Sequence, residues 1–299
     1  MDSRKPYVAF VILSHKNPEQ INLLAEALHK IYNCRVFLHV DKKSASIRGK
    51  IDTDLLTLIP EEKSISVTWG TYSQCEATLA LIEAALSAGE KFDYVWLISG
   101  QDLPIMGSEK AAALLPAEPT PFIAVRDSSH PRFQWFSKRN DIAYPKCLMY
   151  RTLLSKIGRK ALQFATGGIM HTWSVFRRKL GIPYYFGSSW WCLPYDCLRE
   201  MMDIMESNPK VAAYFLRALN PDESMFQTLF MQTAYAGKQK GIMTYIDWSQ
   251  GGASPRTLTL AQWDDLAAAS KKYAFARKFD FSVDEAVCHR VIKELCGID

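Results

Sequence analysis

Residues 7–40, YVAFVILSHKNPEQINLLAEALHKIYNCRVFLHV, contain two short apolar runs separated by an amphipathic segment. Tyr7 to Leu13 and Arg35 to Val40 have the length and apolar content of buried strands. Between them, Asn17 and Pro18 place a good cap residue before a proline, a pattern typical of the first turn of a helix. The stretch therefore predicts a strand, a helix and a second strand parallel to the first.

The same alternation continues toward the middle of the chain. Ser73-Gln74-Cys75-Glu76 has the Ser-x-x-Glu form of a capping box and opens an Ala- and Leu-rich helix that is expected to reach about Ser87. Tyr94 to Ile98 is a third apolar strand, which ends in Ser99-Gly100-Gln101-Asp102. Alternating strands and helices favour an α/β fold with a mostly parallel central sheet flanked by helices. Such sheets bind ligands beyond the carboxyl ends of their strands, so site residues should follow the strands.

The second half of the chain has a less regular pattern. From Pro119 to Gly187 the sequence is basic, aromatic and glycine-containing, for which we expect long loops and one or two short helices. Order returns with a strand from Ser188 to Leu193 and a later strand from Ile242 to Ile246. Helix starts are expected near Pro194, at Asn220-Pro221-Asp222-Glu223, at Thr259-x-x-Gln262 and at Ser282-x-x-Glu285. The chain has no internal repeat or linker, so one domain is expected.

Composition excludes several classes of protein. Of 299 residues, 48% are hydrophobic and 22% charged, which is typical of a globular protein and not of a disordered or membrane-spanning one. The first apolar run is too short to span a bilayer and has no signal-peptide cleavage pattern after it. The seven cysteines include no Cys-x-x-Cys pair, which indicates reduced thiols and not a disulfide framework or zinc ribbon. We therefore expect a cytoplasmic protein.

The net charge of +5 is unevenly distributed. Between Arg126 and Leu180 there are twelve Lys and Arg against two Asp, so this segment carries +10 and the rest of the chain carries −5. Such asymmetry points to an acidic ligand or surface. Two explanations remain open, since Tyr150 to Leu180 combines large apolar residues with seven cations. In the first explanation, the segment lies peripherally on an anionic membrane surface. In the second, its cations surround an acidic glycan.

Several common enzyme motifs are missing. No Gly-x-Gly-x-x-Gly follows the first strand, and no Gly-x-x-x-x-Gly-Lys-Ser/Thr occurs. The zinc-helix motif His-Glu-x-x-His and the nucleophile elbow Gly-x-Ser-x-Gly are also missing. Asp52-Thr53-Asp54 has the Asp-x-Asp form by which many sugar-nucleotide enzymes hold a divalent metal. It follows no apolar strand, however, and carboxylates are common at helix starts, so no metal site is predicted there.

Seven short segments flank the predicted strands in a definite order. They are His39-Val40-Asp41-Lys42-Lys43-Ser44, Val67-Thr68-Trp69-Gly70, Ser99-Gly100-Gln101-Asp102-Leu103-Pro104-Ile105, Gly187-Ser188-Ser189-Trp190-Trp191, Pro221-Asp222-Glu223-Ser224-Met225-Phe226-Gln227-Thr228, Pro255-Arg256-Thr257-Leu258 and Ala276-Arg277-Lys278-Phe279-Asp280. In order and spacing this set resembles the core-2/I-branching glycosyltransferase family, whose relatives include peptide O-xylosyltransferases. The resemblance extends from Val8 to about Leu295 and is weakest between Ser128 and Phe186.

The resemblance implies a GT-A-like nucleotide-sugar-binding fold in a single domain, 1–299. About 1–118 would form the nucleotide-binding half, and about 119–299 the acceptor-side insertion, the catalytic base and the diphosphate-binding part. The implied activity is inverting transfer of a sugar from a UDP-sugar of the GlcNAc, xylose or glucose type to a hydroxyl of a glycan or glycolipid, forming a β linkage. No metal or other cofactor is expected. The implied partners are the UDP-sugar donor and a glycan or lipid-linked saccharide acceptor.

The resemblance also implies roles for individual residues. Glu223 matches the catalytic base, and Arg256 and Lys278 match the basic pair that holds the diphosphate. Further donor-binding positions are Ser14, His15, Asp41 and Trp69, and acceptor-binding positions are Arg132, Lys138, Arg139, Trp190, Trp191, Tyr245 and Trp248. Adjacent strand residues face opposite ways, so one of Trp190 and Trp191 is expected to pack inside while the other stacks on a sugar ring.

The chemistry of sugar transfer is consistent with these residue types. Displacing a nucleoside diphosphate needs a base for the attacking hydroxyl and positive charge for the departing phosphates. Arg256, as a planar fork, and Lys278, as a point charge, can supply that charge without a metal. A single carboxylate base suits attack from the face opposite the leaving group, hence inversion.

Simpler interpretations of the same residues remain open. Glu223 stands three residues after Asn220 and would complete an Asn-x-x-Glu capping arrangement. Lone Arg and Lys side chains are usually solvated surface cations. The alternative function is a basic membrane- or nucleic-acid-binding protein without catalysis, although no recognisable nucleic-acid module is present and nucleic acid is not an expected partner. A glycosidase is a third class, but the sequence offers no convincing second carboxylate for Glu223.

Overall fold

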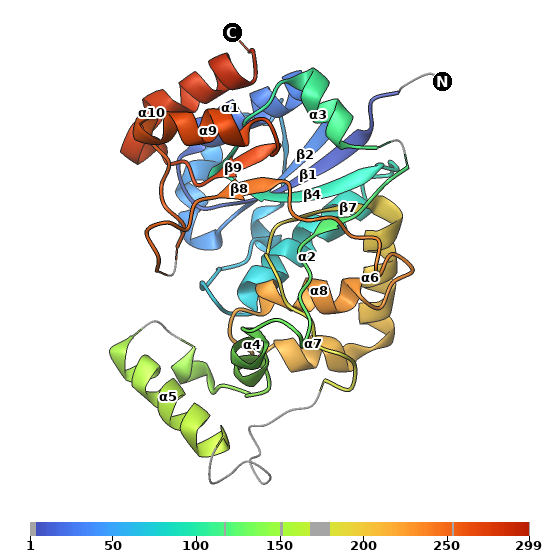
Figure 1. Cartoon of the computed structure of the whole chain (residues 1–299), viewed down its shortest axis with the longest axis vertical. Helices are drawn as coiled ribbons and strands as arrows, with labels where there is room; N and C mark the ends of the chain where they lie inside the picture. Colours follow the sequence, from blue (N-terminus) through green and yellow to red (C-terminus); the bar gives the residue numbers. More distant parts are fainter. Residues whose placement is uncertain (1–3, 117, 150–151, 168–179, 253, 299) are drawn as a thin grey trace.

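A six-stranded central sheet runs through the computed structural model, which describes residues 4–116, 118–149, 152–167, 180–252 and 254–298 (Figure 1). The strand order is β3-β2-β1-β4-β7-β6. The strands are β1 (Tyr7–Ser14), β2 (Asn33–Val40), β3 (Thr57–Leu58), β4 (Tyr94–Ser99), β6 (Phe122–Ile123) and β7 (Trp191–Pro194). The first four are mutually parallel, whereas β7 is antiparallel to both of its neighbours. The predicted α/β class with a mostly parallel central sheet flanked by helices is confirmed.

A smaller sheet joins the end of the chain to its middle. Its order is β5-β9-β8, formed by β5 (Asp102–Pro104), β9 (Phe275–Arg277) and β8 (Thr244–Ile246). Strand β9 pairs antiparallel with β5 and parallel with β8. Since β5 follows almost directly after β4, this pairing brings the segment after residue 275 to the carboxyl end of the central sheet.

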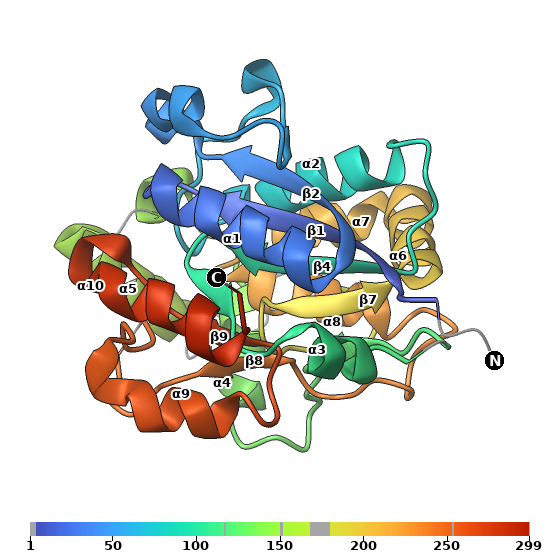
Figure 2. The same ribbon diagram turned by 90° about the horizontal axis from the view of Figure 1, so that it is seen from above.

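Helices cover both faces of the central sheet (Figure 2). One face packs against α1 (Pro18–Ile31), α3 (Ser108–Leu114), α9 (Trp263–Ala269) and α10 (Phe281–Arg290), and the other against α2 (Ser73–Leu86), α6 (Tyr195–Ser207), α7 (Pro209–Phe215) and α8 (Met225–Phe230). The two-residue period of a strand explains the two cores, because Val8 and Phe10 of β1 belong to one cluster and Ala9 and Val11 to the other.

Two further helices lie away from the sheet. They are α4 (Phe133–Asn140) and α5 (Leu153–Gly167), which occupy the lower end of the molecule in Figure 1. Short turns complete the fold, namely the 3₁₀ turns η1 (Lys42–Lys50), η2 (Glu61–Lys63), η3 (Lys146–Leu148), η4 (Pro221–Glu223) and η5 (Leu260–Gln262) and a π turn η6 (Val291–Leu295).

Tertiary contacts engage the side chains of the two predicted cap residues. Asn17 is the N-cap residue of α1, which begins at Pro18 as predicted, but its side chain makes no capping bond. Its amide Nδ2 donates to Asp280 Oδ1 at 2.8 Å, and its Oδ1 accepts from the Ser282 hydroxyl at 3.1 Å. Ser73 is the first helical residue of α2 and not its cap, and its hydroxyl accepts a hydrogen bond from the Thr68 N–H at 2.8 Å. Both side chains therefore fasten loops at the carboxyl edge of the sheet.

Other expected boundaries shift by a few residues. The strand predicted from Ser188 begins at Trp191, since the Ser188 carbonyl accepts from Gln227 Nε2 at 2.6 Å outside the sheet. The helix predicted at Asn220 is the short turn η4, and α8 begins after it at Met225. The capping box of Thr259 and Gln262 is confirmed, with both of its reciprocal bonds formed.

Candidate functional site

The carboxyl ends of β1 and β2 hold the first predicted donor residues together. The Ser14 hydroxyl donates to the carbonyl of His39 at 3.0 Å, and the Asp41 N–H donates to the Ser14 carbonyl at 2.9 Å. The Asp41 carboxylate accepts from the Lys43 N–H at 2.9 Å and is 7% exposed. Parallel pairing of the two strands explains why residues distant in sequence meet at this edge.

His15, also a predicted donor residue, lies exposed in the turn after β1. Partial desolvation and the neighbouring Lys16 lower the pKa of its imidazole below the ordinary value, while the carboxylates of Asp41 and Asp280 act in the opposite direction. The ammonium group of Lys278 contributes to the same lowering. The charge of Lys278, from the other end of the chain, therefore acts on the His15 imidazole.

The segment after β9 is fastened to this edge. The Phe279 N–H donates to the Gln101 carbonyl at 2.8 Å, and Asp280 forms an ion pair with Lys16 and accepts from Asn17 at 2.8 Å. Burial acts to raise the pKa of the Asp280 carboxyl, but the hydrogen bonds from Lys16 and Asn17 outweigh it and hold the pKa below its ordinary value. These contacts fix Lys278 beside the ends of β1 and β4.

The two predicted diphosphate-binding cations lie on neighbouring, hydrogen-bonded segments. Lys278 Nζ donates to Ser254 Oγ at 3.2 Å, and the Lys278 carbonyl accepts from the Leu258 N–H at 2.9 Å. Arg256 lies between those two residues, and its guanidinium is 3.8 Å from Asp247 Oδ2. Partial burial, together with the charges of Lys16 and Arg277, lowers the pKa of Lys278. Arg256 and Lys278 are thus both brought to the end of the smaller sheet at which the parallel strands β8 and β9 finish.

A buried ion pair that the sequence analysis did not single out lies next to Lys278. Asp102 and Arg277 face each other in the β5–β9 register, with Arg277 Nη1 3.3 Å from Asp102 Oδ1. Asp102 is 1% exposed, and its burial raises the carboxyl pKa while Arg277 opposes that rise. The signal available in the sequence was an aspartate directly after a buried strand and an arginine beside Lys278.

The predicted base Glu223 lies in the turn η4, between two other motif segments. On one side, the Asn220 N–H donates to the Gly70 carbonyl at 2.9 Å, next to Trp69, whose side chain is 46% exposed. On the other side, the Gly187 N–H donates to the Glu223 carbonyl at 2.8 Å. The Asn220 side chain makes no capping hydrogen bond, so the simple Asn-x-x-Glu capping arrangement is not formed.

A short series of contacts joins this turn to the cations. The Ser189 hydroxyl donates to Asp222 Oδ2 at 2.7 Å, and the next residue, Trp190, carries the guanidinium of Arg277 over its ring, 4.0 Å from the centroid. Arg277 in turn precedes Lys278. The arrangement places a carboxylate-bearing turn and a cationic strand end on either side of residues 188–190. A carboxylate can accept a proton there, and the cations can stabilise an anionic group.

Of the two adjacent tryptophans, only Trp190 is placed where a ligand could reach it. Trp190 is half-buried, whereas Trp191 is 1% exposed and packs beside Phe226 in the core. Trp190 lies just before β7 and packs partly against the same core cluster as Trp191, so the opposite facing expected of two adjacent strand residues does not apply to this pair. The acceptor role predicted for Trp191 disagrees with its burial. The physical reason is that β7 is an interior strand, so the Trp191 side chain faces the helices on one side of the sheet.

The remaining predicted acceptor residues are spread over two regions. Trp248, 53% exposed, and the half-buried Tyr245 lie on or after β8, and Arg132 precedes α4, where its guanidinium lies over the ring of Trp135. The side chains of Lys138 and Arg139 lie outside the described residues. The acceptor residues that the structure describes therefore lie in separate places, near β8, before β7 and before α4.

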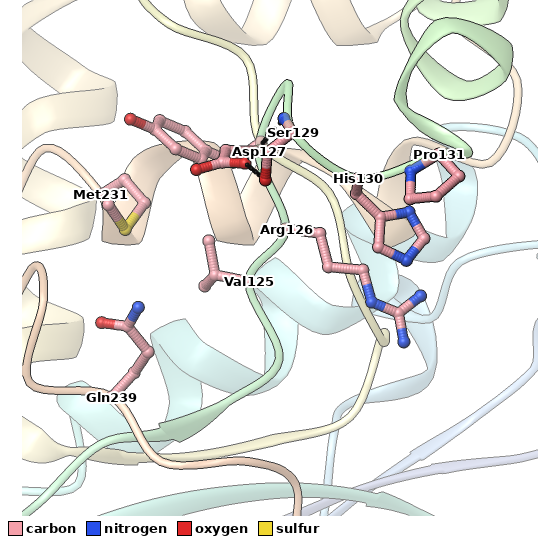
Figure 3. Close-up of a pocket in the computed structure, with 9 residues that line it drawn as sticks. Val125, Arg126, Asp127, Ser129, His130, Pro131, Met231 and Gln239 are labelled. Carbon is pink, nitrogen blue, oxygen red and sulfur yellow. Dashed lines mark hydrogen bonds between the residues drawn. The ribbon is translucent and has the colours of Figure 1, made fainter.

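A cavity of about 440 Å³ opens beside the loop that precedes Arg132 and α4 (Figure 3). It is lined by Val125, Arg126, Asp127, Ser129, His130, Pro131, Tyr185, Met231 and Gln239, so it contains none of the predicted site residues. Arg126 pairs with Phe186, and the following residue, Gly187, bonds to Glu223. The cavity thus adjoins the turn of the predicted base without including it.

Other features bear on metals and membranes. Asp52 accepts from the Asp54 N–H at 3.0 Å in an exposed turn. Among the residues that the structure describes, no three His, Cys, Asp or Glu side chains are grouped so as to hold a metal ion. In the same part of the chain, no helix has the length and apolar character needed to cross a bilayer.

Comparison with known proteins gives a matching family and a curated relative. A family model described as "Branch: Core-2/I-Branching enzyme" matches residues 8–270. Among curated proteins, the chain is similar to "Xylosyltransferase oxt" of Drosophila melanogaster, with 23% identity over 325 residues that cover 99% of this chain and 34% of that protein. The chain therefore spans about a third of the length of this curated relative.

Two solved structures are similar at lower identity. One is the apo structure of the WbbM bifunctional glycosyltransferase, with 11% identity and a TM-score of 0.39 over 99% of this chain and 50% of that one. The other is an active-site mutant of LgtC, with 11% identity and a TM-score of 0.40 over 91% of this chain and 86% of that one.

Proposed function

Because the chain belongs to the core-2/I-branching enzyme family, and is therefore a glycosyltransferase, we propose that it transfers a sugar from a UDP-sugar to a hydroxyl of a glycan or lipid-linked saccharide. In this proposal the donor is of the UDP-GlcNAc, UDP-xylose or UDP-glucose type. The reaction inverts the anomeric carbon and gives a β-linked product, because one carboxylate acts as the only base.

The observation that supports the proposal is the series of contacts from Asp222, the neighbour of Glu223, to Arg277, the neighbour of Lys278. Ser189 holds the residue next to Glu223, and Trp190 holds the residue next to Lys278. In the proposed step, the Glu223 carboxylate takes the proton of the acceptor hydroxyl while the oxygen of that hydroxyl forms a bond to the anomeric carbon. The bond from that carbon to the diphosphate breaks at the same time, and the electron pair leaves with UDP.

Side-chain cations are proposed to stabilise the departing diphosphate without a metal. Lys278 and Arg256 lie on segments that are bonded to each other, so both can approach one anionic group. Positioned cations in a partly desolvated site stabilise developing charge at little reorganisation cost. Arg277 is paired with Asp102 and stacked on Trp190, so its proposed role is to position the strand end that carries Lys278.

The uridine side is proposed to lie at the carboxyl edge of β1 and β2. Ser14, His15 and Asp41 meet there, and the held Asp41 carboxylate offers acceptors for a base or ribose. Trp69 would add an exposed ring beside the turn of Glu223. On the acceptor side, Trp190, Tyr245, Trp248 and Arg132 remain the proposed contacts.

The experiment that tests this proposal is a thermal-shift screen with UDP, UDP-GlcNAc, UDP-glucose, UDP-galactose and UDP-xylose, each with and without EDTA. A ligand that binds the folded state raises apparent stability, by about 2.7 kcal/mol at a hundredfold excess over Kd. We expect UDP and at least one UDP-sugar to raise the melting temperature in both conditions. The absence of a shift with every uridine compound would contradict the proposal.

A further inference from the structure

Helix α5 has an apolar face that the rest of the described chain leaves uncovered. Leu153, Leu154, Ile157 and Phe164 are 73%, 80%, 57% and 75% exposed, and Leu154 is the most exposed large hydrophobic side chain of the described residues. Single exposed apolar side chains are common on protein surfaces, but several large ones grouped on one helix are typical of an interaction surface. No role for this face is contained in the proposed transfer reaction.

The opposite face of α5 is firmly attached to the molecule. Leu162 packs against the small core of Ile142, Tyr144 and Leu219. The Ser155 hydroxyl donates to the Cys147 carbonyl at 3.0 Å, and Gln163 Nε2 donates to the Tyr144 hydroxyl at 2.8 Å. These contacts hold α5 against the rest of the protein with its apolar face toward the outside. The face is therefore exposed while the helix stays in place.

The exposed side chains form one stripe with cations along its edge. At 3.6 residues per turn, Leu153, Ile157 and Phe164 fall within about 40° of one another around the helix, and Leu154 extends the stripe to about 100°. Lys160 and Lys156, both exposed, lie at about 20° and 60° beyond Leu153 on the same edge. This order of apolar stripe and flanking lysines is typical of a helix that lies in a bilayer surface.

The surrounding charge identifies the kind of surface. Between Asp141 and Asp196 the chain has eight Lys and Arg and no Asp or Glu. Two copies of the chain that met through α5 would place lysines against lysines without a carboxylate on the helix to offset them. An anionic lipid surface, in contrast, attracts each such cation and also covers the apolar stripe.

We propose that α5 is an interfacial helix by which this protein binds the surface of an anionic lipid bilayer. The position of the helix gives the contact a use. Asn140, the last residue of α4, accepts a hydrogen bond from the Ser224 hydroxyl at 3.3 Å, so the α4–α5 region is joined to the turn that carries Glu223 (Figure 1). A bilayer bound at α5 would bring membrane-attached molecules toward that turn. The membrane contact itself does not depend on the proposed transfer reaction.

The test is flotation of the full chain with vesicles of phosphatidylcholine alone and of phosphatidylcholine with phosphatidylglycerol. We expect binding to the anionic vesicles that weakens with added salt, and much weaker binding to the neutral ones. Leu154→Ser and Phe164→Ser should each lower the partition coefficient about tenfold. Lys156→Gln and Lys160→Gln should each lower it about fivefold on anionic vesicles only. Both apolar side chains are exposed, so the variants should keep the wild-type melting temperature.

The matched control is Val283→Ser, which removes a 59% exposed apolar side chain from a different helix, α10, and should bind as the wild type does. The proposal is overturned if the wild-type chain does not float with anionic vesicles at low salt. It is equally overturned if Leu154→Ser and Phe164→Ser float like Val283→Ser. Sedimentation that reveals an α5-dependent dimer with no vesicle binding would assign the face to a second copy instead.

Discussion

The guanidinium of Arg277 lies over the indole ring of Trp190, with its Cζ atom 4.0 Å from the ring centroid. Trp190 belongs to the segment beside the turn of Glu223, and Arg277 directly precedes Lys278. The contact therefore joins these two segments. Arg277 also pairs with the buried Asp102 of β5, and the Asp102 carboxylate accepts a hydrogen bond from the Ser99 N–H at the end of β4 at 2.6 Å. The guanidinium is therefore linked through Asp102 to the central sheet. Glu223 and Lys278 are 55 positions apart in sequence, and the segments that carry them are linked through this arginine.

Replacing Glu223 by Gln tests the base. Gln keeps the shape of the side chain but cannot accept the proton, so we expect the rate of UDP release in the presence of an acceptor to fall about 10²- to 10⁴-fold. Affinity for UDP, measured by calorimetry, should stay unchanged. Glu206→Gln, on the exposed side of α6, serves as the control. Equal activity of the Glu223→Gln variant would refute the assignment.

Removing either cation tests the leaving-group site. A charge-assisted hydrogen bond contributes about 1.5–3 kcal/mol, so Lys278→Ala and Arg256→Ala should each weaken UDP binding by about ten- to a hundredfold. Uridine, which lacks phosphates, should bind these variants nearly as it binds the wild type. Lys271→Ala, an exposed lysine a few residues earlier, should leave both affinities unchanged. Wild-type UDP affinity in both site variants would show that the cations lie elsewhere.

Chelation tests the proposed independence from metal. Since Arg256 and Lys278 are proposed to supply the positive charge, excess EDTA should leave the rate of sugar transfer unchanged, and added manganese should not raise it severalfold. The measurement is UDP release in a chelator titration with a fixed donor and acceptor. An absolute manganese requirement would contradict the proposal while leaving the role of Glu223 open to its own test.

Breaking the Asp102–Arg277 pair should destabilise the fold. Asp102→Ala leaves a guanidinium buried without its carboxylate, which typically costs about 3–5 kcal/mol in the free energy of unfolding. The double variant Asp102→Leu/Arg277→Met removes both charges and should recover much of that loss. Asp196→Ala removes an exposed pair with Lys91 and should cost less than about 1 kcal/mol. Urea unfolding measures all three, and equal losses for Asp102→Ala and Asp196→Ala would contradict the burial argument.

The lowered pKa of Asp280 predicts a pH dependence of stability. Its carboxyl ionises at lower pH in the folded chain than the ordinary value of 3.8, because Lys16 and Asn17 bind the carboxylate despite its burial. The resulting stabilisation is fully present above the unfolded pKa and is lost as pH falls through the folded pKa. The difference in unfolding free energy between wild type and Asp280→Asn should therefore be largest near pH 7 and shrink toward about pH 3. A constant difference would contradict the assignment.

The periodic parts of the fold could be predicted from the sequence because their signals are local. The runs at Tyr7 and Tyr94 are apolar throughout, as strands buried on both faces must be, and both are strands in the structure. The same local rules predicted capping by Asn17 and Ser73. Asn17 occupies the cap position of α1 without a side-chain capping bond, because its side chain binds Asp280, and Ser73 is the first helical residue of α2, with its hydroxyl bonded to the Thr68 N–H.

The sequence alone therefore determined the α/β class, the edge of the sheet at which Ser14 and Asp41 meet, and the order of the motif segments. Only the tertiary structure decided that Trp191 turns into the core, that Asp102 pairs with Arg277 across 175 positions, and that α5 presents its apolar face outward. Hydrophobic periodicity is a property of neighbouring residues. A buried ion pair or an uncovered face depends on which distant surfaces the whole chain brings together.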